Sequence, residues 1–167
     1  MESHKKVDLI VIGGGAAGYM GAIKAAEEGL TSVSLLEGSI RPLEKVRISG
    51  GGRCNVTNAC WDPSELVKNY PRGEIPLKGA FSRFAAGDAV EWFERRGLKL
   101  IIEEDGRLFP ESNTSDEVVS CLHQAALRSG VNCFMKKLVI HIKYLFDEGF
   151  QIECRDGSCF YSRTVLL

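Results

Sequence analysis

The stretch that decides the fold is Leu9-Ile10-Val11-Ile12-Gly13-Gly14-Gly15-Ala16-Ala17-Gly18. Residues 7–12 form an apolar, largely β-branched run, which is typical of a buried parallel strand. A G-x-G-x-x-G turn follows at once, and residues 16–28 then have the composition and spacing of a helix that Gly29 ends. Strand, glycine turn and helix in this order predict the first βαβ unit of a Rossmann-type α/β fold.

Three glycines of this turn have a predicted task. Gly13 allows the tight turn out of the strand, Gly15 lets a pyrophosphate approach the backbone, and Gly18 lets the helix pack closely on the sheet. The helix begins at Ala16 and Ala17, where unpaired N–H groups and the positive end of the helix dipole favour a bound anion. The turn therefore predicts a dinucleotide site, although a glycine turn that binds nothing is the simpler alternative.

An acidic residue lies where such a site needs one. Residues 33–36 read as the second strand, and Glu37 ends it, 19 residues after Gly18. A carboxylate about 20 residues beyond the glycines accepts hydrogen bonds from the adenosine ribose hydroxyls. It also repels a 2′-phosphate, so the sequence favours FAD or NAD over NADP.

A second glycine cluster occupies residues 49–58, Ser-Gly-Gly-Gly-Arg-Cys-Asn-Val-Thr-Asn. Its three consecutive glycines, Gly50 to Gly52, allow the backbone to press against a ligand and to offer N–H groups to an anion. Arg53 is a candidate partner for the pyrophosphate or for charge on a reduced flavin, and Asn55 a donor to ring or ribityl oxygens. In the alternative interpretation Arg53 is a surface charge and Asn55 shapes a turn. Cys54 reads as a packed thiol, because it lacks a partner cysteine and an adjacent base.

The length and composition of the chain limit the classes of protein to which it can belong. The chain of 167 residues is 44% hydrophobic and 26% charged with a net charge of −1, as expected for one globular domain. The absence of a basic block argues against nucleic acid and anionic membranes as partners, and no apolar run is long enough to span a bilayer. The six cysteines form neither a C-x-x-C pair nor a metal-ligand spacing, so the sequence predicts no metal site and no disulfide framework. We therefore expect a reducing, cytoplasmic location, or an organelle if a longer form carries a transit peptide.

The remainder of the chain is expected to hold further α/β elements. Residues 41–57 are predicted to form a loop, and residues 131–135 a third parallel strand. A three-stranded antiparallel β-meander follows at about 136–161, and another buried strand starts at 164–167. Because the chain stops inside that strand, the domain is expected to be incomplete at its C-terminus, as in a fragment or a short isoform. The other predicted helices span 64–68, 78–84, 87–96 and 115–129, and a predicted hairpin pairs 98–103 with 107–109.

In the order of its motifs the chain resembles one family. The motifs are Val11 to Gly18, Leu35-Leu36-Glu37, Lys45, Ser49 to Asn58 and Gly106 to Ser112. The resemblance is to FAD-dependent oxidoreductases described as NAD(P)/FAD-dependent or aminoacetone oxidase-like, with a bile-acid reductase branch. Family members often carry Gly-Arg-Lys before the second cluster, and of these three residues only Lys45 is matched here. Members of the family are also much longer than this chain.

The resemblance implies a glutathione-reductase-type FAD-binding domain over residues 1–167 that takes part in hydride transfer. It implies FAD as cofactor, NAD(P)H as a candidate electron donor and a small-molecule substrate, and it leaves the catalytic residues unassigned. Together with the motifs, it gives the following candidate cofactor-binding residues: Gly13, Gly15, Ala16, Ala17, Gly18, Glu37, Lys45, Ser49, Gly50, Gly51, Gly52, Arg53 and Asn55.

Three functions remain open on the sequence. The first is the FAD-binding portion of an oxidoreductase, with the adenosine diphosphate held by the Gly13–Gly18 turn and Glu37. The second is a truncated, non-catalytic isoform or nucleotide-binding module. The third, an NAD-only Rossmann enzyme, fits less well because of the second glycine cluster.

Overall fold

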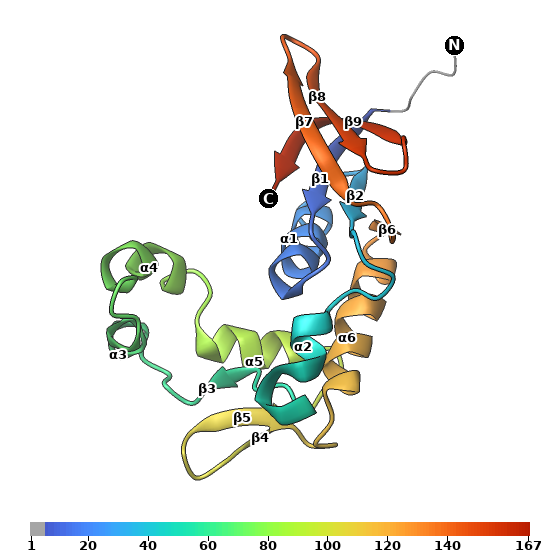
Figure 1. Cartoon of the computed structure of the whole chain (residues 1–167). Coiled ribbons are helices and arrows are strands. Elements are labelled where there is room, and N and C mark those ends of the chain that lie inside the picture. The colour runs from blue at the N-terminus through green and yellow to red at the C-terminus, as the bar shows by residue number, and fades with distance from the viewer. Residues whose placement is uncertain (1–5) are drawn as a thin grey trace. The chain divides into compact units, whose positions relative to one another are not determined.

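The computed structural model describes residues 6–167, so residues 1–5 of the predicted domain lie outside the described part. The chain divides into two compact units (Figure 1). Unit 1 consists of the described residues up to Lys45 together with Leu122–Leu167, and unit 2 is Val46–Cys121. The interpretation of residues 1–167 as one domain stays a prediction.

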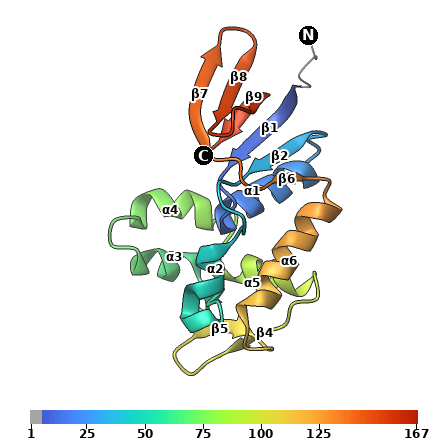
Figure 2. The ribbon, with the colours of Figure 1, turned by 45° about the vertical axis from the view of Figure 1, so that its right-hand side comes forward.

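Unit 1 is built on a six-stranded sheet with the strand order β6-β2-β1-β9-β8-β7 (Figure 2). Strands β6, β2, β1 and β9 pair in parallel with one another, whereas the pairs β9–β8 and β8–β7 are antiparallel. This mixed α/β Rossmann-type sheet with an antiparallel meander is the predicted fold class. The strands are β1 (Val7–Ile12), β2 (Val33–Leu36), β6 (Asn132–Phe134), β7 (Val139–Leu145), β8 (Gly149–Cys154) and β9 (Cys159–Leu166).

The end of the chain differs from the prediction. Residues 159–161 and 164–167 were expected to belong to two strands, but β9 is one continuous strand that serves both neighbours. Its first half pairs antiparallel with β8, and its second half pairs parallel with β1, where Val165 lies opposite Ile10. The expected burial is also wrong, because Thr164 and Leu166 are exposed. A strand can leave an antiparallel meander and continue into a parallel sheet without a turn. The sequence pattern does not show whether two such segments are joined in one strand.

Helix α1 (Ala16–Glu27) packs on β1 and β2. Its buried residues are Tyr19, Ala22 and Ile23, at the i, i+3, i+4 spacing of a helix face turned to a sheet. The Tyr19 hydroxyl lies 3.3 Å from Nδ1 of His123, on the half of helix α6 (Ser115–Arg128) that belongs to unit 1. The βαβ unit read from the sequence is therefore formed, with β6 added parallel to β2 as predicted.

Unit 2 combines helices with a small antiparallel sheet in the order β3-β5-β4. The hairpin around Asp105 and Gly106 is formed as predicted, and the Asp105 carboxylate accepts a hydrogen bond from the Arg107 N–H at 3.1 Å. Its strands are β3 (Thr57–Asn58), β4 (Leu100–Ile102) and β5 (Arg107–Pro110). Its helices are α3 (Pro63–Leu66), α4 (Glu74–Phe81) and α5 (Ala86–Glu94), with the 3-10 turn η2 (Val67–Asn69).

Two segments of the chain are more helical than the sequence suggested. Residues 41–57, predicted as a loop, contain α2 (Glu44–Ile48) and the 3-10 turn η1 (Ser49–Gly52). Helix α4 begins at Glu74, ahead of the predicted turn at 78–84. It tolerates Pro76 because this residue lies in the first turn, where the backbone N–H groups have no acceptor within the helix. Within residues 6–167, no helix is long and apolar enough to cross a membrane.

Candidate nucleotide-binding site

The glycine turn lies where the order of the parallel strands changes direction. From β1 the chain passes through α1 to β2 on one side, while β9 flanks β1 on the other side. In open α/β sheets ligands bind at such a switch point, beyond the carboxyl ends of the strands. Both β1 and β9 end here, so the topology of unit 1 places the glycines at the position of a ligand crevice.

The backbone of the turn fits the three predicted glycine tasks. Gly13 has φ +107°, which side chains disfavour. A Cβ on Gly18 would lie 1.9 Å from the Gly13 carbonyl oxygen, so only glycine permits this close packing. A Cβ on Gly15 would meet nothing within 4 Å, and this open space is where a ligand can reach the backbone.

Hydrogen bonds from the segment after β2 hold the turn in place. The Gly13 N–H donates to the Leu36 carbonyl at 2.8 Å, and the Gly14 N–H donates to Oε2 of Glu37 at 2.6 Å. In return the Gly14 carbonyl accepts the N–H of Leu43 at 2.8 Å. Gly14, which the sequence did not mark as a site residue, is thus bonded through both its N–H and its carbonyl group. The only sequence signal for it was that a glycine also occupies the middle position of the G-x-G pattern.

The carboxylate of Glu37 is fixed by two backbone donors. Oε2 accepts from Gly14, and Oε1 accepts from the Ser39 N–H at 2.7 Å. Partial burial by itself would raise the pKa of Glu37, but the N–H groups of Ser39 and Gly14 stabilise the ionised form and hold the pKa below its ordinary value of 4.5. Each oxygen keeps a further lone pair, so the carboxylate still has acceptor capacity for a ligand hydroxyl.

The start of α1 is open to an anion. Gly15 caps the helix without a side-chain hydrogen bond, and the first turn, which the structure describes in full, contains no acidic residue. Ala16 and Ala17 are exposed there, with N–H groups that have no acceptor within the helix. A cavity of about 280 Å³ adjoins this turn and is large enough for part of a dinucleotide. It is lined by Val11, Ile12, Gly13, Gly15, Ala17, Gly18, Leu166 and Leu167.

Leu166 and Leu167 were not among the predicted site residues. They line the cavity because β9 runs beside β1 and ends at the same edge of the sheet. The apolar run at the end of the chain was the only signal in the sequence. It could not be used without knowing that this strand is the neighbour of β1.

The second glycine cluster lies in unit 2 and has its own structural constraints. Gly50, Gly51 and Gly52 all have positive φ, at 56°, 68° and 88°. A Cβ on Gly50 would approach the Phe109 ring to 2.8 Å, whereas one on Gly51 would meet nothing within 4 Å. Gly50 is therefore needed for packing, and Gly51 is the position that a ligand can approach.

Part of the predicted anion nest is occupied by the chain itself. The N–H groups of Arg53 and Cys54 both donate to the Ser49 carbonyl, and the Ser49 hydroxyl donates to the Val46 carbonyl at 2.9 Å. Cys54 is buried, and burial raises the pKa of its thiol, so it is the packed thiol that the sequence favours.

Arg53 is engaged within unit 2. Its Nη1 lies 2.5 Å from Oε1 of Glu103 and 3.3 Å from Oδ1 of Asn113, and its guanidinium carbon lies 3.9 Å from the centre of the Phe109 ring. A ligand anion would therefore have to share this guanidinium with Glu103. The contact with phosphate or flavin stays a prediction, while the observed contacts tie the glycine cluster to β5.

The two remaining candidates are exposed. Lys45 lies on α2 at the end of the first segment of unit 1. Asn55 lies in unit 2 on the wall of a cavity of about 380 Å³. Their contacts with a cofactor stay predictions.

The fold and the switch-point turn define a Rossmann-type nucleotide-binding domain. Residues 7–167 match the HI0933-like protein Rossmann domain, and the chain belongs to this family. The match confirms the resemblance indicated by the sequence motifs.

Two characterised relatives are similar over most of the chain. A 3-dehydro-bile acid delta(4,6)-reductase of Clostridium scindens is 32% identical over 160 residues, covering 94% of this chain and 37% of the reductase. A ribosomal RNA dihydrouridine synthase of Escherichia coli is 28% identical over 138 residues, covering 83% of this chain and 33% of the synthase. The chain thus spans about a third of the length of these relatives.

Among solved structures, a flavocytochrome c3 fumarate reductase has the same fold. It superimposes with a TM-score of 0.71 at 19% identity, over 96% of this chain and 33% of the reductase. The likeness supports the Rossmann-type arrangement of the elements.

Replacing the glycines separates their structural roles. We expect Gly18→Ala to destabilise unit 1 by about 3 kcal/mol or more, because the methyl group collides with the Gly13 carbonyl. Gly15→Ala should cost about 1 kcal/mol or less, because its methyl group points into open space. Urea unfolding followed by circular dichroism measures both changes. Equal losses would contradict this assignment.

The stabilising effect of Glu37 should depend on pH. Because the folded pKa lies below that of the unfolded chain, the contribution is complete above about pH 4.5 and is lost as the pH falls through the lower folded value. The stability difference between the wild-type protein and Glu37→Gln should therefore be constant from about pH 6 to 8 and shrink below pH 4.5.

Urea midpoints measured across this pH range test the effect. Glu148→Gln, at an exposed position in the turn after β7, is the control and should differ little from the wild type at any pH. A Glu37 difference that grows on acidification would contradict the predicted sign.

The contacts of Arg53 give a third prediction. Arg53→Lys keeps the charge but removes the planar group from Phe109, so we expect unit 2 to lose about 1 kcal/mol of stability. Arg107→Lys is the matched control, since that guanidinium lies farther from the same ring, at 5.3 Å, and should cost about 0.5 kcal/mol or less. Comparable urea midpoints for the two variants would argue against a structural role of Arg53.

Proposed function

We propose that this chain is the FAD-binding portion of a flavin-dependent oxidoreductase. In this proposal the Gly13–Gly18 turn and Glu37 hold the adenosine diphosphate moiety of FAD. Membership of the HI0933-like family supports the proposal, as does the name of the Clostridium scindens relative, a reductase.

One observation carries the proposal: Gly15 leaves open space beside a helix start that lacks acidic residues, at the switch point of the sheet. A pyrophosphate placed there accepts hydrogen bonds from the N–H groups of Ala16 and Ala17 and meets the positive end of the α1 dipole. A side chain at position 15 would fill the space that the phosphates need.

In this proposal Glu37 favours a cofactor whose adenosine ribose has a free 2′-hydroxyl. Its carboxylate is oriented by Gly14 and Ser39 before any ligand arrives, and its remaining lone pairs accept the ribose hydroxyls. Because its pKa lies below 4.5, the carboxylate is ionised near neutral pH and repels a 2′-phosphate. This repulsion argues against NADP, and the family match favours FAD over NAD. We therefore propose FAD in this pocket, with NAD(P)H as an electron donor that binds elsewhere.

A bound flavin supplies the electron transfer, and the chain supplies binding, orientation and electrostatics. The residues of the glycine turn anchor the cofactor through backbone N–H groups, and Glu37 fixes the ribose. No catalytic residue is proposed, because none of the candidates is an acid or base placed by the structure at a reacting atom.

We propose a small-molecule substrate and a cytoplasmic location. The two relatives carry the names of different substrates, a bile acid and ribosomal RNA. The net charge of −1 and the lack of a basic block favour a small molecule over RNA for the part of the protein in this chain.

The test is FAD binding by the purified 167-residue chain, followed by visible absorbance after gel filtration. We expect flavin bands to elute with the protein, and Glu37→Ala to weaken binding by about tenfold, because charge-assisted hydrogen bonds to the ribose are lost. Gly15→Ala should weaken it as well, because a methyl group then occupies the phosphate position.

The matched control is Glu28→Ala, which removes an exposed glutamate paired with Lys24 in the same unit and should leave the affinity unchanged. A folded chain that binds no FAD would refute the proposal and favour the non-catalytic isoform. Tight NAD binding without FAD binding would favour the NAD-only enzyme.

A further inference from the structure

Strand β4 of unit 2 is an edge strand that lacks the usual protection against pairing with another chain. In the sheet order β3-β5-β4 it has a neighbour on one side only. Its residues Leu100, Ile101 and Ile102 are all apolar, and the last two are 43% and 57% exposed. Its register with β5 is continuous, and the strand contains neither proline nor a charge. Such an edge is a template for a further strand.

Strand β7, at the edge of the sheet in unit 1, has the protection that β4 lacks. Its register with β8 shifts between Val139 and His141, which marks a bulge, and Lys143 stands in the middle of the strand. A bulge and a lysine both oppose the pairing of an edge strand. Of these two edges, β4 is therefore the one suited to accept a partner.

The backbone of β4 directs hydrogen-bonding groups to its open side. The Glu103 N–H donates to a carbonyl of β5 at 2.9 Å, and the Lys99 carbonyl accepts the N–H of the residue after β5, also at 2.9 Å. In an antiparallel ladder alternate residues direct their N–H and C=O groups to the same partner, so Ile101 faces β5 as well. Leu100 and Ile102 alternate with these residues and direct their N–H and C=O groups away from β5.

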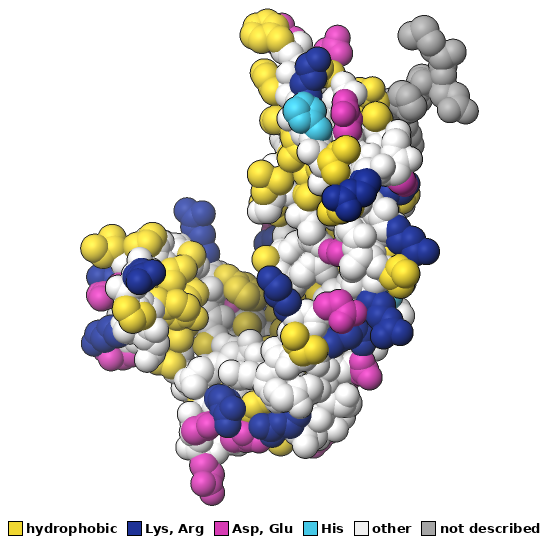
Figure 3. All heavy atoms as spheres, in the orientation of Figure 1, with side chains coloured by type: hydrophobic (Ala, Val, Ile, Leu, Met, Phe, Trp, Pro, Cys, Tyr) yellow, Lys and Arg dark blue, Asp and Glu magenta, His cyan; other side chains and the backbone are white. Residues whose placement is uncertain are grey.

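The two ends of β4 carry opposite charges. Lys99 precedes the strand, and Glu103, Glu104 and Asp105 follow it. Figure 3 shows acidic side chains gathered around the turn of the β4–β5 hairpin. An open hollow of about 490 Å³ is lined by Ile102 and these three acidic residues, so the acidic end is accessible to a partner.

The charges beside β4 have capacity for a further partner. The side chain of Lys99 is 78% exposed, and its ion-pair partner within the described residues is Glu111, at 3.7 Å. Oε1 of Glu103 lies 2.5 Å from Nη1 of Arg53, whereas Oε2 has only the looser contact with Arg107, at 3.6 Å. A carboxylate oxygen accepts more than one hydrogen bond, so Oε2 can also accept an ammonium group.

These features complement a second copy of the same strand, running antiparallel. With the two-fold axis at Ile101, Lys99 of each copy lies opposite Glu103 of the other, and Leu100 lies opposite Ile102. Each Leu100–Ile102 pair then exchanges both of its N–H···O bonds, because these residues direct their backbone groups to the open edge. The two Ile101 side chains meet at the axis. Cross-strand pairs of opposite charge and of apolar side chains both stabilise a sheet.

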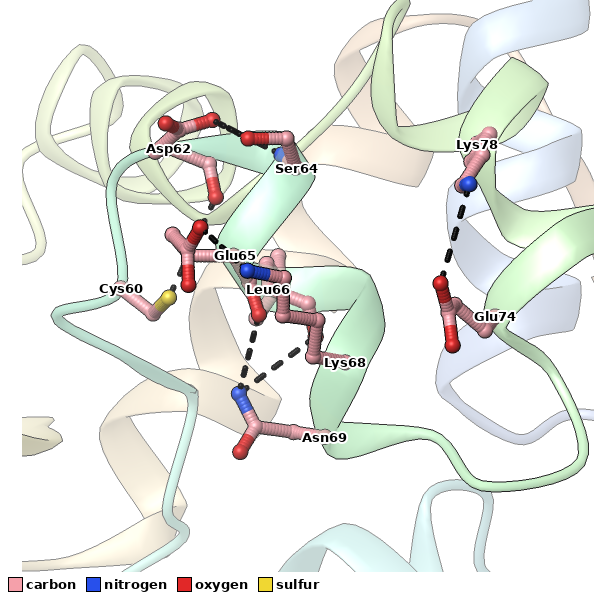
Figure 4. Close-up of polar contacts among 9 residues, drawn as sticks. All are labelled: Cys60, Asp62, Ser64, Glu65, Leu66, Lys68, Asn69, Glu74 and Lys78. Carbon is pink, nitrogen blue, oxygen red and sulfur yellow. Dashed lines mark hydrogen bonds and ion pairs between the residues drawn. The ribbon is translucent and has the colours of Figure 1, made fainter.

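Unit 2 has another exposed apolar surface, on α3 and α4, whose charges do not specify a partner. Hydrophobic side chains gather there (Figure 3), and Ile75 is 80% exposed. The charged side chains pair within the same short segments, Glu65 with Lys68 at 2.6 Å and Glu74 with Lys78 at 3.7 Å (Figure 4). They form no separated positive and negative ends, so this surface provides control positions for β4.

We propose that two copies of the chain pair through β4 and join their small sheets into one sheet of the order β3-β5-β4-β4-β5-β3. Because β4 is short, the contact belongs to the small, reversible class of protein interfaces. The inference requires neither a bound cofactor nor the proposed function, so each can fail without the other.

Sedimentation of the purified chain at concentrations from about 1 μM to 1 mM tests the proposal. We expect a reversible equilibrium between monomer and dimer. Ile101→Lys places like charges on both sides of the axis, and Lys99→Glu places a carboxylate opposite Glu103 of the other copy. Each change should weaken association by about tenfold or more. Circular dichroism establishes that each variant is folded.

The matched controls make the same changes on α4. Ile75→Lys replaces an exposed isoleucine, and Lys78→Glu replaces an exposed lysine whose carboxylate partner lies at 3.7 Å, as for Lys99. Both controls should associate like the wild type. A chain that stays monomeric throughout, or β4 variants that associate like the wild type, would overturn the proposal. Loss of association in Ile75→Lys would place the interface on α4 and would overturn it as well.

Crosslinking tests the position of the axis. Residues of a non-hydrogen-bonded antiparallel pair have Cα atoms about 4.5 Å apart, a separation that a disulfide spans. Ile101→Cys should therefore crosslink to itself under mild oxidation. Ile102→Cys lies at a more exposed position but faces Leu100, so it should give about tenfold less covalent dimer. The wild-type chain, with its own free cysteines, sets the background on non-reducing gels. Equal crosslinking of the two variants, or more in Ile102→Cys, would overturn the proposed pairing.

Discussion

The hydrogen bond between the Gly14 N–H and the Glu37 carboxylate is the interaction on which unit 1 depends. A glycine turn has no side chains with which to hold itself, so its conformation must be imposed from outside. Glu37 does this from the end of β2 while the Leu43 N–H holds the Gly14 carbonyl. A Cβ at position 14 would lie 2.9 Å from the Glu37 side chain, so the bond itself requires glycine.

The same carboxylate therefore has a structural role and a proposed binding role. Because two backbone N–H groups orient it, it loses little freedom when a ribose hydroxyl arrives. The arrangement explains why an acidic residue suits this position better than a neutral hydrogen-bonding one. Ionisation strengthens both backbone hydrogen bonds, and in the proposed site it also repels a 2′-phosphate.

Unit 2 solves a similar problem with different chemistry. Three glycines of positive φ are followed by Arg53, and the cluster is fixed by stacking on Phe109 and by an ion pair with Glu103. In isolation an arginine beside three glycines reads as a phosphate ligand. Its observed partners lie 50 or more residues away along the chain, and no local pattern could reveal them.

The sequence by itself determined the βαβ unit, the parallel β6 and the antiparallel meander, because these follow from apolar periodicity and turn residues that act over short distances. It also determined the positions of Gly13, Gly15, Gly18 and Glu37. The tertiary structure alone decided that β9 is one strand beside β1, that Leu166 lines the cavity and that Gly14 binds Glu37. Each of these depends on contacts between residues far apart in sequence, which form only when strands that are remote along the chain become neighbours in the sheet.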